Sequence, residues 1–307
     1  MSAWGRPGRS TPSKALSNPF LLINPRSGDQ RPSSDELAAE AAQLGVDVHV
    51  LREGEDASEL AGHAAAEGAE AVGIAGGDGS LASVASISLE RDLPFVCVPF
   101  GTRNHFARDL GLDLDDPMGA LAAFHGKERR VDVGVVRERL FLNNVSLGLY
   151  ASVVHDPKRK TRNRLMAFVR MAPAALGRGR RPLGLSFEIE GRREQHSALV
   201  LLVANNAYRL QNIADLGERA SLEEGLLHAY VVEAVSRWAL LALLARAALG
   251  KVSNAEGLVE HSAPKFRVEA SRSRLNAAID GEPLVLEAPL EFEIRPRALR
   301  VLLPAGS

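Results

Sequence analysis

The sequence predicts a chain of two parts, an α/β amino-terminal part and an antiparallel β-sandwich at the carboxyl end. Three observations support this prediction. The chain has 307 residues, more than one ordinary small domain needs. Strand and helix patterns alternate over residues 18–132, which is typical of a doubly wound parallel sheet. Strand patterns with few helices follow over residues 133–303, which indicates a sandwich or barrel.

The composition is that of a soluble globular protein, with 46% apolar and 24% charged residues. Lys and Arg (37) nearly balance Asp and Glu (38), so no overall charge attracts nucleic acid. The single cysteine, Cys97, lies in an apolar run and is expected to be a core residue in a reducing, cytoplasmic setting. No segment reaches the roughly 18–20 apolar residues of a membrane span. Residues 1–17 lack a signal-peptide core and predict a disordered tail.

The amino-terminal part carries four strand patterns, each followed by a turn or a helix pattern. The strands are expected at 20–23, 46–51, 71–75 and 94–99, and the helices at 34–44, 58–67, 80–89 and 118–125. Three polar turns that contain glycine follow the first, third and fourth strands, at 24–28, 76–80 and 101–109. Because parallel strands end at a common edge, where ligands of open α/β sheets bind, we expect these turns to converge.

The second part is expected to be mostly strands. The predicted strands are 130–136, 140–150, 183–190, 197–205, 226–232, 265–270 and 274–280. A basic run at 158–164 leads into an apolar stretch at 165–176. This pattern fits a solvated face, or a peripheral contact with an anionic membrane surface. The apolar segment 238–249 fits that surface or a buried helix equally well.

The most informative turn is Gly76-Gly77-Asp78-Gly79-Ser80. Glycine allows close approach of a ligand to the backbone, and a helix start with Ser80 as its N-cap would attract phosphate oxygens. A carboxylate at Asp78 would repel phosphate unless a cation or a transferable proton lay between them. The turn is neither a Walker A loop nor a dinucleotide fingerprint. It therefore favours metal-assisted phosphoryl chemistry, with an ordinary tight turn as the alternative.

Further carboxylates lie in the second part. Asp280-Gly281-Glu282 places two of them around a glycine, although Asp-Gly is also a hairpin signal. Glu224 lies in another acidic turn before a strand. Phosphoryl transfer requires a phosphate cradle, a divalent cation and a proton acceptor for the attacking hydroxyl. Mg²⁺ prefers one or two carboxylates together with water and phosphate oxygens. A cleft between the two parts would bring these groups together.

Four motifs in this order resemble those of the diacylglycerol kinase catalytic family, most closely its soluble bacterial lipid kinases, which are related to sphingosine and ceramide kinases. They are Asn24-Pro25-Arg26-Ser27-Gly28, Gly76-Gly77-Asp78-Gly79-Ser80, the run from Pro99 to Ala107, and Asp280-Gly281-Glu282. The resemblance extends from about Phe20 to Leu303. It implies ATP in a cleft between a nucleotide-binding domain (18–132) and a β-sandwich domain (133–303). It also implies γ-phosphate transfer to a lipid hydroxyl such as that of diacylglycerol.

The resemblance also implies roles for individual residues. Thr102 would hydrogen-bond the nucleotide, Glu282 would be the general base, and Asp78 would organise Mg²⁺ and phosphate. Two turns would contact the nucleotide and wrap its phosphates: Asn24, Pro25, Arg26, Ser27 and Gly28, and Gly76, Gly77, Asp78, Gly79, Ser80, Leu81 and Ala82. A structural metal site would comprise Ser221, Glu224 and Leu226, of which Ser221 and Leu226 would offer backbone carbonyls.

This sequence departs from the family pattern at several positions. Asp29 stands where a basic residue is common, Ser80 replaces threonine, Glu224 replaces aspartate, and His105 stands where many members carry aspartate. A nucleotide-contacting threonine has no match at 51–53. Two alternatives stay open: an NAD-kinase-like enzyme with a similar two-domain plan, and a nucleotide- or lipid-binding regulator that has lost catalysis. The expected location is cytoplasmic, with peripheral membrane contact as an option. The sequence does not determine the lipid or the oligomeric state.

Overall fold

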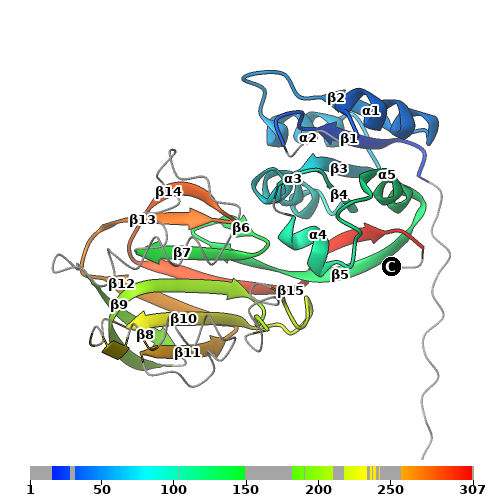
Figure 1. Cartoon of the computed structure of the whole chain (residues 1–307). Helices are drawn as coiled ribbons and strands as arrows, with labels where there is room; N and C mark the ends of the chain where they lie inside the picture. The colour runs from blue at the N-terminus through cyan, green and yellow to red at the C-terminus, as the bar shows by residue number, and fades with distance from the viewer. Residues whose placement is uncertain are drawn as a thin grey trace, which may run out of the picture.

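A computed structural model of the chain describes residues 16–27, 32–102, 104–148, 182–189, 191–209, 218–233, 236, 238–239, 242 and 257–305. It has an α/β half and an antiparallel β half, which confirms the predicted fold class (Figure 1). The predictions for 1–15, 158–164, 165–176 and 243–249 lie outside the described residues. Among the helices that the structure describes, none has the length and apolar character to cross a membrane.

The α/β half is built on parallel strands in the order β4-β3-β1-β2. These strands are β1 (Pro19–Ile23), β2 (Asp47–Val50), β3 (Ala71–Gly76) and β4 (Phe95–Pro99). The helices are α1 (Ser34–Gln43), α2 (Ala57–Ala66), α3 (Asp78–Glu90), α4 (His105–Asp109), α5 (Pro117–Ala120) and the 3₁₀ helix η1 (Leu121–His125). One hydrophobic cluster contains residues of α2 and α3, and another contains residues of α1, α5 and η1. Helices therefore cover both faces of the sheet, as a doubly wound fold requires.

Local signals explain where these helices begin. The side chain of Ser33 accepts from the backbone N–H of Glu36, and the Glu36 carboxylate accepts from that of Ser33, which makes a capping box before α1. Asp56 caps α2, and Asp116 caps α5 ahead of Pro117. Cys97 on β4 is buried, as predicted.

The second half is a β-sandwich whose interior is a third hydrophobic cluster. Its first strands are β5 (Lys127–Val136), β6 (Arg139–Phe141), β7 (Asn144–Gly148), β8 (Leu183–Ile189) and β9 (Arg192–Asn205). The later strands are β10 (Leu227–Glu233), β11 (Leu258–Ala263), β12 (Lys265–Ala270), β13 (Arg274–Ile279), β14 (Glu282–Glu287) and β15 (Leu290–Leu303). The pairings among these strands are antiparallel.

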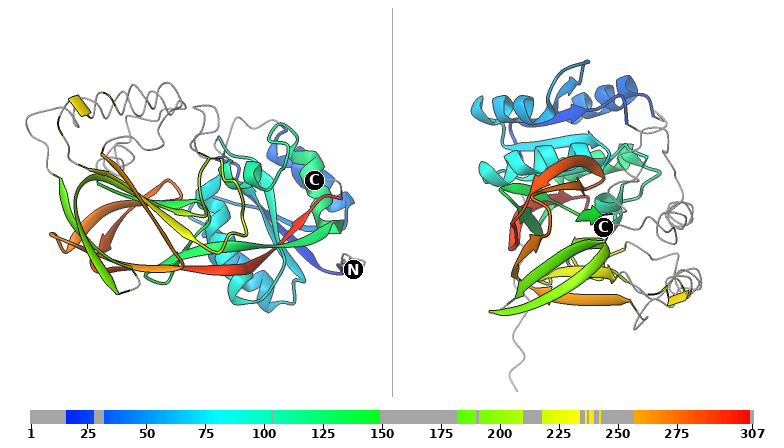
Figure 2. Two further views of the ribbon diagram at one scale, coloured as in Figure 1. Left: turned by 90° about the horizontal axis from the view of Figure 1, so that it is seen from below. Right: turned by 90° about the vertical axis from the view of Figure 1, so that its left-hand side faces the viewer.

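The long strands β5 and β15 join the two halves. They pair with each other from Val136 opposite Phe292 to Lys127 opposite Leu303, and β15 also adds a parallel strand beside β4. Phe292 is buried in the sandwich core, whereas Val301 is buried in the α/β core. Figure 2 shows this two-stranded ribbon running from one half to the other. Because β5 also contributes to both cores, the domain boundary near residue 132 stays a prediction.

The structure differs from the expected elements in three ways. Strands β11, β14 and β15 were absent from the prediction, although Leu290, Phe292 and Ile294 alternate with exposed residues along β15. The predicted strand 140–150 is two strands, because the backbone between them turns to donate hydrogen bonds to Asp280. The prediction of Ser80 as N-cap was wrong, since α3 begins at Asp78 and its N-cap is Gly77.

Candidate active site

The first turn of α3 presents backbone N–H groups at the carboxyl edge of the sheet. Strand β3 ends at Gly76 and α3 begins two residues later, with Gly77 in extended conformation as the N-cap. No side chain in the described part of the chain caps this helix end. The first N–H groups of a helix have no partner within the helix, and the helix dipole is positive there. This end of α3 is therefore suited to bind an anion such as phosphate.

The turn after β4 packs directly against this helix start. A Cβ atom on Gly101 would lie 2.4 Å from the Cα of Gly77, so the contact requires glycine. The Asn104 side chain closes the turn, because it accepts from the Gly101 N–H (3.0 Å) and donates to the Gly101 carbonyl (2.8 Å). Thr102 is exposed in the same turn. Two of the three predicted turns thus meet at one place.

The Asp78 carboxylate is buried and uses both oxygens within the protein. Its side chain is 7% exposed. One oxygen accepts from the Phe106 N–H (3.1 Å) and from Nδ2 of Asn143 (3.1 Å). The other accepts from the backbone N–H of His105 (3.2 Å) and lies 3.0 Å from its Nδ1. Burial raises the pKa of Asp78, but the hydrogen bonds from His105 and Phe106 outweigh burial and leave the pKa below its ordinary value.

A chain of buried polar groups extends from Asp78 into the second half. The Asn143 side chain donates to Asp78 and accepts from Nη2 of Arg219 (3.0 Å). Arg219, 5% exposed, donates from Nε to the Asp109 carboxylate (2.6 Å) and from Nη1 to the Leu142 carbonyl (2.5 Å). We call Asp78, Asn143, Arg219 and Asp109 the junction network. It ties α3 and α4 to the loop between β6 and β7 and to the segment before β10.

The β13–β14 hairpin brings Glu282 to the same helix start. Glu282 is exposed, and a Cβ on Gly79 would lie 2.4 Å from its Oε1, so the carboxylate rests on the Gly79 backbone. Asp280-Gly281-Glu282 forms the turn of a hairpin, because it lies between the paired strands β13 and β14. The same turn places Glu282 at the start of α3, so the structure is compatible with both interpretations of this motif. Two motifs about two hundred residues apart in the sequence meet here.

Asp280 anchors this hairpin from inside the protein. Its carboxylate accepts from three consecutive backbone N–H groups, those of Leu142 (2.7 Å), Asn143 (2.7 Å) and Asn144 (3.0 Å). Burial raises the pKa of Asp280 to about 7; these three hydrogen bonds oppose the rise, and the neighbouring Asp78 adds to it. The pKa values of the buried Asp78 and of the partly buried Asp280 therefore shift in opposite directions.

The turn after β1 lies beside the first turn of α3. Nδ2 of Asn24 donates to Oγ of Ser80 (3.0 Å), and Oδ1 of Asn24 accepts from the Arg26 N–H (3.1 Å). Pro25 and Ser27 belong to this turn, whereas Gly28 lies outside the described residues. The remaining residues of the α3 motif, Leu81 and Ala82, belong to the helix body, and Leu81 is buried in the core.

The predicted metal ligands have partners within the protein. The Glu224 carboxylate accepts from the Ala207 N–H (3.0 Å) and lies 3.2 Å from Nε2 of His228. The Leu226 carbonyl accepts from the Asn206 N–H (3.0 Å), and Ser221 Oγ accepts from the Glu223 N–H (3.0 Å). These contacts favour a hydrogen-bonded loop anchor, and metal binding by Ser221, Glu224 and Leu226 stays a prediction.

Sequence reasoning missed the residues that support the site. Asn143 and Arg219 belong to no motif, and Asp109, at the end of the predicted turn 101–109, was assigned no role; the convergence of the three depends on the fold. Asp132 gave a signal that could have been used, because it is a charged residue inside an apolar strand. It is fully buried, and its carboxylate accepts from the N–H groups of Gly225 (2.7 Å) and Arg297 (2.7 Å).

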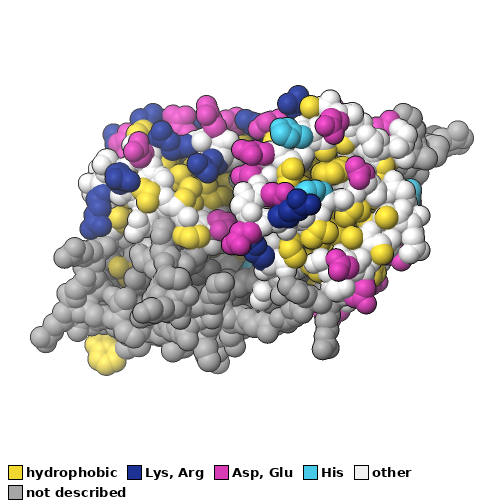
Figure 3. Space-filling model, turned by 90° about the horizontal axis from the view of Figure 1, so that it is seen from above, with side chains coloured by type: hydrophobic (Ala, Val, Ile, Leu, Met, Phe, Trp, Pro, Cys, Tyr) yellow, Lys and Arg dark blue, Asp and Glu magenta, His cyan; other side chains and the backbone are white. Residues whose placement is uncertain are grey.

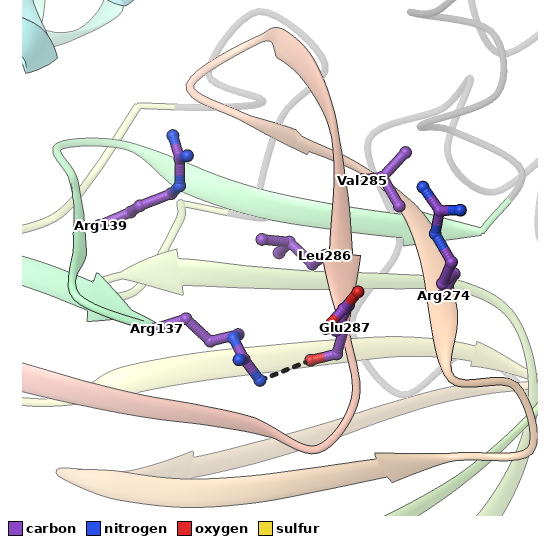
Figure 4. Close-up of a pocket in the computed structure, with 6 residues that line it drawn as sticks. All are labelled: Arg137, Arg139, Arg274, Val285, Leu286 and Glu287. Atoms are coloured by element: carbon purple, nitrogen blue, oxygen red, sulfur yellow. Dashed lines mark hydrogen bonds between the residues drawn. The ribbon is translucent and has the colours of Figure 1, made fainter.

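A separate pocket lies at the other end of the β13–β14 hairpin (Figure 4). The cavity is about 240 Å³ and is lined by Arg137, Arg139, Arg274, Val285, Leu286 and Glu287. Nη1 of Arg137 donates to the Glu287 backbone carbonyl (2.9 Å). Three guanidinium groups beside Val285, which is 44% exposed, make this pocket both cationic and apolar.

Comparisons with known proteins agree with this architecture. Residues 18–136 match the family model described as diacylglycerol kinase catalytic domain, and residues 143–303 match the model described as YegS C-terminal NAD kinase beta sandwich-like domain. The chain is 31% identical over 301 residues to a protein of Pseudomonas aeruginosa (strain PAO1) named "Probable lipid kinase YegS-like", covering 94% of each chain. It is 27% identical over 295 residues to a protein of Mycobacterium tuberculosis (strain H37Rv) named "Diacylglycerol kinase", covering 92% of this chain and 94% of that one.

A crystal structure of a diacylglycerol kinase from Bacillus anthracis (strain Sterne) has a similar fold. Its TM-score is 0.70 at 15% sequence identity, and the alignment covers 95% of this chain and 98% of that chain. At this identity the likeness concerns the fold alone.

We predict that Asn143→Ala destabilises the protein by about 1–3 kcal/mol, because it leaves a buried Arg219 donor without its acceptor and removes one donor from Asp78. Urea unfolding of both proteins measures the change. Asn276→Ala is the matched control, since Asn276 is exposed on β13, and its effect should stay within about 0.5 kcal/mol. Equal effects of the two substitutions would contradict the junction network.

Asp280 should make stability depend on pH. Its pKa is about 7 in the folded protein against an ordinary value of 3.8, so between these values the folded state binds the extra proton. The free energy of unfolding therefore falls as pH rises from about 4 to about 7, by up to about 4 kcal/mol from this group. Asp280→Asn should lack this component when urea unfolding is measured across that range. A difference between wild type and variant that does not change with pH would contradict the assignment.

Proposed function

The chain belongs to the diacylglycerol kinase catalytic-domain family, and from this premise we propose that it transfers the γ-phosphate of ATP, with Mg²⁺, to the hydroxyl group of a lipid such as diacylglycerol. Lipid kinase activity follows from the family. The nucleotide, the metal and the particular lipid are our proposal. The observation that carries it is the contact of Glu282 with the first turn of α3, because that contact joins a proton acceptor to a phosphate site.

The residues divide the work of phosphoryl transfer between them. We assign the phosphate oxygens to the backbone N–H groups at the start of α3, where the helix dipole stabilises negative charge. Asn24, held against Ser80, and the exposed Thr102 lie at the edge of this site and are assigned to the nucleotide. Glu282 is exposed and lies against Gly79 at the start of α3, so its carboxylate is placed to receive the proton of the attacking hydroxyl.

Asp78 is assigned a positioning role. Both of its oxygens are engaged by His105, Phe106 and Asn143, so it holds the start of α4 against the start of α3. Its negative charge is retained because its pKa is lowered. Mg²⁺, when bound with the nucleotide, would neutralise phosphate charge at the start of α3. The exposed Glu282 carboxylate offers an oxygen donor of the kind that this ion prefers, whereas Asp78 contributes its buried negative charge.

Access to a lipid requires contact with a membrane or micelle surface, and two described features support such contact. Trp238 is 81% exposed, and tryptophan favours the interface between water and lipid. The arginine-lined pocket offers guanidinium groups to anionic headgroups. On the face in Figure 3, Lys and Arg side chains gather over the sandwich half. We therefore propose a cytoplasmic enzyme that binds the membrane surface peripherally.

Glu282→Gln should lower the rate of phosphate transfer from ATP to dioleoylglycerol by at least about 10²-fold, because the amide cannot accept the hydroxyl proton. Formation of labelled phosphatidate from γ-labelled ATP measures the rate. Glu90→Gln is the control and should keep the wild-type rate, since Glu90 is exposed at the opposite end of α3.

Three results would count against the proposal. Full activity of Glu282→Gln would remove the assigned base. Phosphorylation of NAD in place of lipids would support the NAD-kinase-like alternative. Retained ATP binding by calorimetry without turnover on a panel of diacylglycerol, ceramide, sphingosine and phosphatidylglycerol would indicate a regulator that has lost catalysis.

A further inference from the structure

At one end of β9 the inward-facing side chains of the sandwich are polar and titratable and not apolar. Residues 194, 196 and 198 share one face of this strand, and Ala198 on that face is buried in the sandwich core. On β11, His261 likewise shares its face with the buried Ala263. Inward-facing positions of a sandwich are normally apolar. At this end they carry Glu194, His196 and His261.

The two imidazoles point directly at each other. Nε2 of His196 lies 3.2 Å from Nε2 of His261, and Oε2 of Glu194 lies 3.9 Å from each of them. Ligand atoms bonded at 2.0–2.1 Å to a tetrahedral zinc ion lie roughly 3.3 Å from one another. The nitrogen pair already has this spacing. Glu194 is half exposed, with 53% of its side chain accessible, so a small rotation brings its oxygen into range.

A second carboxylate fixes the orientation of one ring. Oε1 of Glu233 on β10 lies 2.9 Å from Nδ1 of His196, so Nδ1 donates its proton there and Nε2 carries a lone pair toward His261. Carboxylate–histidine pairs of this kind orient and strengthen metal-binding histidines.

The rings are also held mechanically. The side chains of His196 and His261 are 8% and 12% exposed. Both pack on the Phe187 ring, with centroid distances of 5.5 and 5.4 Å. Restricted rings that face each other in this way need either a shared proton or a cation between their nitrogens. Among the described residues, this is the group of His, Cys, Asp and Glu whose ligand atoms converge closely enough to hold a metal ion.

We propose that Glu194, His196 and His261 bind one divalent transition-metal ion of the Zn²⁺ class, with Glu233 orienting His196 and water completing the coordination. Two imidazoles and one carboxylate suit zinc, whereas Mg²⁺ prefers oxygen ligands. The site is independent of the proposed kinase chemistry. The Asn205 backbone carbonyl accepts a hydrogen bond from Arg219 of the junction network. His196 lies nine residues from Asn205 on β9, or roughly 30 Å along an extended strand. The ion would cross-link β9 and β11.

Zinc binding to the full chain tests this site. After removal of metal with a chelator, Zn²⁺ is titrated against a chromogenic competitor, and Co²⁺ is added separately to detect the visible absorption of a tetrahedral site. We expect one tight Zn²⁺ per chain and a rise in the unfolding temperature on binding. Glu233→Gln should weaken Zn²⁺ binding by about 10–100-fold. His261→Ala and Glu194→Gln should weaken it by at least as much.

Controls separate ligand loss from misfolding. His63→Ala removes an exposed histidine on α2 and should bind Zn²⁺ like wild type. Glu194→Gln changes a half-exposed side chain and should unfold at the wild-type temperature when Zn²⁺ is absent. The proposal is overturned if wild type binds no stoichiometric Zn²⁺, which leaves an imidazole–imidazole hydrogen bond, or if the folded Glu194→Gln and Glu233→Gln variants bind as tightly as wild type.

Discussion

The site depends on the ionised Asp78 carboxylate, which is buried where the two halves of the molecule meet. Four hydrogen bonds satisfy it, two from the start of α4, one from the His105 ring and one from Asn143. The Asn143 side chain also accepts a hydrogen bond from Arg219, and the Arg219 guanidinium forms an ion pair with Asp109. A buried charge without such partners would cost several kcal/mol. The network therefore fixes the position of the two glycine turns relative to the sandwich, and with it the position of Glu282.

The α/β half could be predicted well because its signals are local. Apolar runs of strand length alternate with capped helices, and the polar turns fall at one edge of the sheet. The sandwich was harder to predict. Strand β15 alternates correctly over Leu290, Phe292 and Ile294, but Pro296 and the register shift after Arg295 interrupt the pattern. The second half of β15 then pairs with β4 in the α/β half. This pairing joins residues far apart in the sequence, so local sequence patterns do not reveal it.

The glycine turns and Glu282 could be predicted from motifs, whereas their supports could not. The sequence suggested that Asp78 faces the metal and phosphate, but the structure turns its carboxylate inward to His105 and Phe106. The sequence predicts Asp280 as part of the Asp280-Gly281-Glu282 turn, but it does not show that the Asp280 carboxylate accepts from three consecutive backbone N–H groups of a distant loop. The Glu194, His196 and His261 cluster joins residues from two strands. In each case the relevant partner is set by the tertiary fold and not by sequence spacing.

We propose that α3 and Glu282 form the two sides of one phosphoryl-transfer site. A crystal structure of the chain with Mg²⁺ and a non-hydrolysable ATP analogue tests it most directly. We expect phosphate oxygens within hydrogen-bond distance of the backbone N–H groups of residues 78–80, with the terminal phosphate facing the Glu282 carboxylate. Nucleotide bound elsewhere, or phosphates that leave the start of α3 empty, would contradict it.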